Sequence, residues 1–182
     1  MTTSLLYQEE TGKIYIRAIG RMTANLCHGL REKVFSRLDN TPKIHDIFVD
    51  LSQCDYMDST FMGILIGINK QLKELSGKGI TVVCPTDECN SLFAGLNIIR
   101  LLHIDTNRKD FPDLMEEIDD RLRPSAEVLL HAHEDLIDIS ENNAIKFKIL
   151  KEQLEKKVEM EKKQREENAA NLKEPEDSGD DT

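Results

Sequence analysis

The chain has 182 residues, a formal net charge of -10 and a hydrophobic fraction of 39%. This length suits one α/β domain with an appendage, because domains usually contain about 100 to 200 residues. The acidic balance argues against a nucleic-acid or anionic-membrane binder, which needs clustered Lys and Arg side chains. No apolar stretch reaches the roughly 20 residues of a membrane span, and residues 1–10 lack a secretion signal, so we expect a cytoplasmic protein.

The cysteines do not have the spacing of a metal site. Cys27, Cys54, Cys84 and Cys89 include no pair separated by two residues, as a zinc knuckle requires. We therefore expect free thiols, no disulfide, no metal and no cofactor.

Residues 1–122 alternate between strand-like and helix-like segments, which predicts an α/β domain with a mixed central β-sheet and covering helices. The first elements are a hairpin of strands at residues 5–8 and 13–19, a helix with Leu26, Leu30 and Val34 at helical spacing, and a buried strand at 44–51. A helix at residues 59–76 ends at the glycines that follow it. The remaining expected elements are a strand at 80–84, a helix at 88–96, a strand at 101–104 and a closing helix containing Phe111, Met115, Ile118 and Leu122.

A long C-terminal helical extension is predicted at residues 123–168, after a junction at Pro124. Its apolar residues keep a spacing near 3.6 but leave a gap at Asn142 and Asn143, so either one long helix or two is compatible with the pattern. The apolar positions beyond the end of the domain are Leu136, Ile139, Phe147, Leu150 and Leu154. These apolar positions predict either a second binding or self-association surface, or packing back onto the domain. Residues 169–182 form an acidic tail that we expect to be disordered.

Residues 49–63 carry the strongest functional signal, because a buried strand ends there and a helix begins. Asp58 or Ser59 can cap that helix. A hydroxyl at this position faces unpaired backbone N–H groups and the positive end of the helix dipole, so the fold would tolerate a phosphate on it. The added charge of about -1.5 to -2 would make the surrounding surface repel a partner that accepts the free hydroxyl.

Residues 48–67, with Met57-Asp58-Ser59-Thr60 at their centre, resemble the STAS domain of anti-sigma factor antagonists, and the resemblance covers roughly residues 3–120. It implies that a serine-kinase anti-sigma factor phosphorylates Ser59 and that a metal-dependent phosphatase reverses the reaction. It further implies that the unphosphorylated protein binds the kinase and frees the sigma factor. The expected function is therefore partner switching in signal transduction and transcription regulation.

The resemblance indicates a partner-binding surface composed of Thr23, Asp58, Ser59, Thr60 and Phe61, with Thr60 as a second possible phosphoacceptor. Phe61 and Thr23 depart from the sporulation members of the family, which have glycine and aspartate at these positions. Each residue also has a structural alternative: Phe61 can be a core residue, Thr23 can cap the first helix, and Ser59 can be a simple N-cap.

Enzymatic activity is not expected, because there is no G-x-S-x-G motif and no histidine has a motif spacing relative to Ser59. His131 and His133 diverge by about 200° on a helix, so a solvated helix is a better interpretation than a metal site. The main alternative function is a non-switching STAS scaffold or assembly subunit, in a stress-signalling or lipid-transport complex, that oligomerises through the helical extension.

Overall fold

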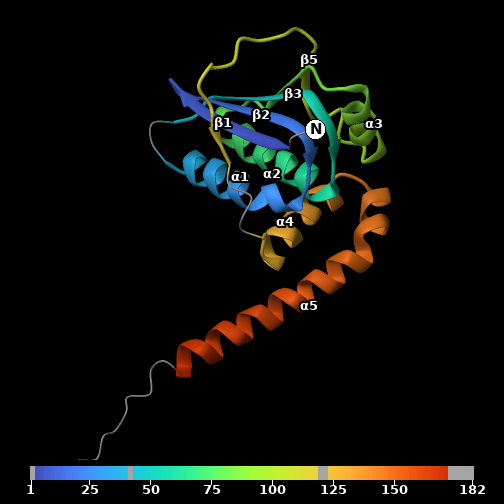
Figure 1. Ribbon diagram of the computed structural model, residues 1–182. Helices are drawn as coiled ribbons and strands as arrows, with labels where there is room; N and C mark the ends of the chain where they lie inside the picture. Colours follow the sequence, from blue (N-terminus) through green and yellow to red (C-terminus); the bar gives the residue numbers. More distant parts are fainter. Residues whose placement is uncertain (1–2, 41–42, 119–122, 172–182) are drawn as a thin grey trace, which may run out of the picture.

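A computed structural model of the protein describes residues 3–40, 43–118 and 123–171 (Figure 1). These residues form one sheet with the strand order β5-β4-β3-β2-β1-β6. The strands are β1 (Ser4–Glu10), β2 (Lys13–Met22), β3 (Asp46–Met57), β4 (Thr81–Val83), β5 (His103–Asp105) and β6 (Glu116–Glu117). Neighbouring strands from β2 to β5 are parallel, whereas β1 is antiparallel to both β2 and β6. The prediction of a mixed sheet is confirmed.

The hairpin of β1 and β2 follows directly from its sequence. Glu10 pairs with Lys13, so Thr11 and Gly12 alone make the turn, and both have positive φ angles. Two-residue turns of this kind match the twist of the flanking strands. In β2 every second residue from Ile14 to Met22 is buried, which gives the sheet one apolar face.

Helices α1 (Ala24–Leu38) and α2 (Ser59–Ser76) lie on this apolar face, and α3 (Asp87–Gly95) packs beside β3 (Figure 1). Helix α2 ends at Ser76 as predicted, and of the two predicted caps, Asp58 and Ser59, the structure has Asp58. Gly77 ends the helix because it adopts a left-handed conformation with φ of 75°, and its N–H donates to the Lys73 carbonyl at 2.9 Å.

The predicted closing helix near residues 111–122 is wrong within the described residues. Residues 116–117 form the edge strand β6 instead, and the Ile118 N–H donates to the Leu5 carbonyl at 2.8 Å. The open edge of β1 offers unpaired backbone groups, and pairing with them outweighs the helical spacing of the apolar residues. Phe111 lies edge-on against the Tyr15 ring, with 5.4 Å between ring centroids. Leu122 lies outside the described residues.

The extension consists of two helices, α4 (Ala126–Ile137) and α5 (Glu141–Asn171). Asn143 explains the gap in the apolar pattern, because its buried side-chain amide donates to the Leu96 and Leu136 carbonyls at 2.9 Å each. Helix α4 lies on the side of α2 opposite the sheet, and α5 extends away from the domain (Figure 1). Helix α5 includes residues 169–171, which the sequence placed in the acidic tail; residues 172–182 of that tail lie outside the described residues.

Candidate functional site

Asp58 links the N-termini of two helices. Strand β3 continues to Met57, beyond its predicted end at residue 51, so Asp58 is the only residue between the strand and α2. One carboxylate oxygen accepts the Phe61 N–H at 2.9 Å and the other accepts the Ala24 N–H at 2.7 Å. The Asp58 N–H donates to the Met22 carbonyl at 3.0 Å. A single carboxylate thus caps both α1 and α2, where a negative charge is favourable.

Thr23 occupies the N-cap position of α1, but its side chain makes no capping hydrogen bond. Asp58 supplies that bond instead, through the N–H of the next residue, Ala24. The structure therefore places Thr23 beside Asp58, as expected for the loop after the hairpin, and leaves its side chain half-buried.

Ser59 is the first residue of α2, and its hydroxyl lies 3.0 Å from Nε2 of His133 in α4. The other ring nitrogen, Nδ1, lies 2.7 Å from the Leu129 carbonyl oxygen. A carbonyl only accepts hydrogen bonds, so Nδ1 carries the hydrogen, and in the neutral ring Nε2 accepts from the Ser59 hydroxyl. Ser59 is therefore a hydrogen-bonded residue at the helix start and not the N-cap, which is Asp58.

His133 is 3% exposed, and its ring lies edge-on against Phe147 of α5 with 5.1 Å between ring centroids. The prediction that this histidine lies on a solvated helix is wrong, whereas His131 is exposed. A pocket of about 300 Å³ adjoins Ser59 between α2, α3 and α5, and Lys146 is the charged residue in its lining. The hydroxyl at residue 59 thus lies between a buried imidazole and a small open pocket.

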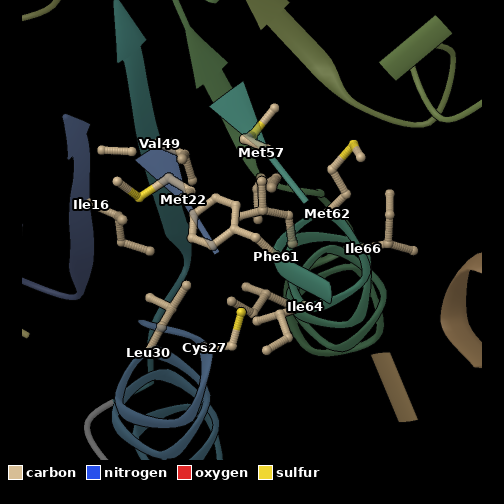
Figure 2. Packing of buried hydrophobic residues seen from close by; sticks show 14 of the residues in the cluster. Ile16, Met22, Cys27, Leu30, Val49, Met57, Phe61, Met62, Ile64 and Ile66 are labelled. Atoms are coloured by element: carbon tan, nitrogen blue, oxygen red, sulfur yellow. The ribbon is translucent and has the colours of Figure 1, made fainter. Parts of the chain in front are cut away.

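Thr60 and Phe61 are buried, and this corrects their assignment to a partner-binding surface. Figure 2 shows the Phe61 ring among Met22, Val49 and Met57, on the sheet side of α2. Phe61 is therefore a core residue, which is the structural alternative that the sequence left open. Thr60 is likewise enclosed, so its hydroxyl is not available to a kinase in this conformation.

Cys27 lies in the first turns of α1, close to the double cap. Burial, and to a smaller extent the Asp58 carboxylate, raises the pKa of the Cys27 thiol. Cys27 is therefore a neutral core side chain, and within the described residues no disulfide joins the four cysteines.

The polar groups beside Ser59 are already paired with backbone groups. The His133 ring is oriented by a backbone carbonyl, and both oxygens of the nearby Asp58 carboxylate already accept backbone N–H groups.

Within residues 3–40, 43–118 and 123–171, no cluster of three or more potential ligand side chains could hold a metal ion. Over the same residues, no helix combines the length and hydropathy of a membrane span.

The family model for the STAS domain matches residues 5–111, which is more than half of the chain. The chain belongs to the STAS domain family. Both Asp58 and Ser59 lie within the matched STAS region, whereas α4 and α5, and with them His133, lie outside it.

Solved structures share this STAS fold. The anti-sigma factor antagonist SpoIIAA in its unphosphorylated form aligns with a TM-score of 0.50 at 15% identity, over 57% of this chain and 89% of that one. A protein of Thermotoga maritima, described as a candidate anti-sigma factor antagonist, aligns with a TM-score of 0.48 at 22% identity, over 55% of this chain and 85% of that one. Among curated proteins, none matches the sequence closely enough to serve as a relative.

Proposed function

We propose that the protein is an anti-sigma factor antagonist that acts as a phosphorylation-controlled partner switch. In this proposal Ser59 is the phosphoacceptor, and the unphosphorylated form binds a serine-kinase anti-sigma factor. A metal-dependent serine phosphatase restores the free hydroxyl. The protein itself catalyses no reaction, acts in the cytoplasm on transcription regulation, and binds neither nucleic acid nor membrane.

The observation that carries the proposal is the position of Ser59 within a STAS domain, directly after the capping aspartate and at the first residue of α2. Asp58 fixes the backbone around this hydroxyl through two helix caps. The Ser59 side chain is half-buried and not enclosed, and it borders a pocket. SpoIIAA, which has the same fold, is described as an anti-sigma factor antagonist with an unphosphorylated form.

The switch works through charge in this proposal. A phosphate at the N-terminus of α2 is locally favourable because of the helix dipole and the free backbone N–H groups of the first turn. The same group adds about -1.5 to -2 charge to a surface that already carries Asp58. A partner surface that accepts the neutral hydroxyl would then face an uncompensated anion, and like-charge contacts cost several kcal/mol.

The direct test is incubation of the full chain with candidate serine kinases from the same genome and ATP, followed by phosphopeptide mass spectrometry. We expect phosphate on Ser59 and none on the Ser59→Ala variant. Absence of phosphate from Ser59 with every such kinase would refute the switch.

Ser59→Asp is expected to fold as the wild type does but to bind the kinase at least about tenfold more weakly, because it places a negative charge at the phosphoacceptor. Isothermal titration calorimetry gives the affinity. Ser52→Asp is the matched control, since it adds the same charge at an exposed position of β3. If Ser59→Asp binds as tightly as Ser52→Asp, the electrostatic mechanism is wrong.

A non-switching STAS scaffold is the second candidate, and the exposed apolar residues of α5 favour it. Ile145 and Ile149 are each 70% exposed and Met160 is 71% exposed. By contrast, Leu136, Phe147 and Leu154, which suggested self-association from the sequence, are buried within this chain. Light scattering of the full chain at several concentrations tests for self-association. A mass that rises with concentration, and is lower in the double variant Ile145→Lys/Ile149→Lys, supports the scaffold. A constant monomer mass refutes self-association.

A further inference from the structure

Helix α2 is buried on all sides, which a helix lying on a single sheet is not. Every residue from 60 to 69 is buried. A helix with one covered face shows an apolar stripe and leaves the opposite face to solvent. A second element must therefore cover the outer side of α2, and α4 is that element (Figure 1).

Ser59 lies on the covered outer side. At 100° per residue, Ser59, Gly63, Ile66 and Lys70 share one face of α2, and we call these residues with Gly67 the outer face. Phe61 points to the sheet from the opposite side, while Ile66 points away from it (Figure 2). The proposed phosphoacceptor is thus part of the surface that α4 occupies.

The two helices approach closely at glycines of this face. A Cβ atom added to Gly63 would overlap the Ala132 carbonyl oxygen and lie 2.6 Å from its carbonyl carbon. A Cβ on Gly67 would lie 2.6 Å from the Asp135 carboxylate and 3.3 Å from the Phe35 ring. At Gly63 the neighbouring atoms belong to the backbone, so only a residue without a side chain allows this contact, whereas at Gly67 they are the ends of side chains. The outer face is thus shaped at Gly63 for α4 in its present position.

Polar contacts at both ends of the outer face hold α4 in register. The Ser59 hydroxyl bonds to His133 at 3.0 Å, and Lys70 Nζ lies 2.7 Å from the Asp135 carboxylate and 3.5 Å from that of Asp138. Burial alone would lower the pKa of Lys70, but the hydrogen bond and charge of Asp135 raise it above its ordinary value. The Lys70 ion pairs lie at the partly exposed rim of this contact, where water or a partner can replace them when α4 leaves, whereas His133 is buried.

We infer that α4 is an internal cover of the partner-binding surface, and that the kinase proposed above must displace it to reach Ser59. This inference rests on the proposed function. In the closed state described here, His133 holds the acceptor hydroxyl and α4 occupies the space beside it. Partner binding and phosphorylation therefore compete with docking of the extension on the same chain.

The cover sets the sensitivity of the switch. When only a fraction of molecules is open, the apparent dissociation constant rises by the inverse of that fraction, so a surface open in about 1% of molecules binds about 100-fold more weakly. Anything that pulls α5 or α4 away from the domain would activate partner binding without any change at Ser59. Movement of the extension would thus control partner binding.

Gly63→Ala tests the cover in the full chain. Alanine is a better helix former than glycine, so the change favours α2 itself, while its methyl group clashes with the backbone of Ala132. Gly95→Ala is the matched control, because a Cβ there meets nothing within 4 Å.

Both variants are compared in a Cys84→Ser/Ile66→Cys background. The substitution of Ile66 introduces a thiol on the outer face, which we call the reporter thiol. The three native cysteines that remain in this background are buried in the core: Cys27, Cys54 and Cys89.

We expect Gly63→Ala to raise the rate of iodoacetamide labelling at the reporter thiol at least tenfold, and Gly95→Ala to leave it within twofold of the parent. Mass spectrometry reads each cysteine separately, and the core thiols must stay protected. Equal labelling of the reporter thiol in the three proteins would overturn the cover.

A second variant covers the case in which Gly63→Ala also exposes the core thiols. Asp135→Lys is then used in place of Gly63→Ala. The new lysine would repel Lys70, which pairs with Asp135 in the wild type. Glu152→Lys makes the same change at an exposed position of α5 and is its control. Equal labelling rates again overturn the inference.

The kinase assay separates this inference from the proposed function. With the native cysteines and Ile66 present, Gly63→Ala should accept phosphate on Ser59 at least tenfold faster than the wild type. Glu152→Lys, at an exposed position of α5 away from the pocket beside Ser59, should match the wild type. Phosphate uptake at equal rates in all three proteins overturns the competition. If none of the proteins accepts phosphate on Ser59 while the reporter thiol is still labelled faster in Gly63→Ala, the kinase switch is refuted. The inference that α4 can leave the outer face would then still stand.

Discussion

The two sides of α2 are built from different kinds of contact. The inner side presents Phe61, Leu65, Ile68 and Leu72 to the core, and all four are fully buried. The outer face combines a serine, two glycines, a buried isoleucine and a lysine, and meets α4 through close backbone approach, one histidine hydrogen bond and an ion pair. The inner side depends on burial of large apolar groups, whereas the outer face adds polar contacts and close backbone approach to the burial of Ile66.

This difference assigns different tasks to the two sides. Burial of a large apolar side chain contributes about 1.5 to 3 kcal/mol, and nothing in water replaces it. Exposed ion pairs contribute about 0 to 1 kcal/mol, and a single hydrogen bond contributes about 0.5 to 1.5 kcal/mol. The inner side holds the larger buried side chains and fixes the fold, so we expect the outer face, where smaller residues and polar contacts meet α4, to open at the lower cost.

Phe61→Ala should give the largest effect, because it removes a fully buried ring from the inner side. Loss of such a ring costs about 3 to 5 kcal/mol of unfolding free energy. Urea denaturation monitored by circular dichroism measures the change, and Phe61→Leu should lose less. A loss below about 1 kcal/mol for Phe61→Ala would show that the inner side is not the more stable of the two.

Asp58→Ala should have an intermediate effect, because it removes the caps of α1 and α2 together. Each N-cap bond contributes about 0.5 to 2 kcal/mol, so we expect a loss of about 1 to 4 kcal/mol in the same denaturation experiment. Asp55→Ala makes the same change at an exposed position of β3 and should be nearly neutral. Similar losses in both variants would contradict a double cap.

Lys70→Ala should have the smallest effect on unfolding, at most about 1 kcal/mol, because its ion pair with Asp135 is partly exposed to solvent. The raised pKa of Lys70 means that this contribution is present below the ordinary lysine value of about 10.4 and is lost as the pH rises through the folded-state value. Hydrogen exchange of α4 amides should nevertheless quicken in Lys70→Ala and not in Lys78→Ala, where the lysine is 74% exposed. Unchanged exchange in α4 would mean that the rim contacts do not hold the cover.

The sequence was sufficient for elements that are set by local pattern. Gly77 and the buried positions of α2 predicted its bounds, and the alternation from Ile14 to Ala18 predicted a strand with one apolar face. Membership of the STAS family followed from a short motif that lies at the end of β3 and the start of α2. In each case the determining residues belong to one element or to two consecutive elements.

The errors concern contacts between residues distant in the chain. Edge strand β6 pairs with β1 across more than 100 residues, and no local signal marks that pairing. His133 lies 74 residues from Ser59, so motif spacing could not relate them. One signal was available: residues 61–68 contain no polar side chain, and a helix that is apolar all round requires cover on both sides.

Helix α5 is long and mostly exposed. Its 31 residues span about 46 Å at 1.5 Å per residue, and beyond Leu154 nearly all of them are exposed. A tilt of about 10° at the base of such a helix displaces its far end by about 8 Å, which follows from that length alone. Because α5 packs against α4, a tilt of α5 that accompanies movement of α4 would be measurable with a fluorophore pair that joins the far end of α5 to the domain.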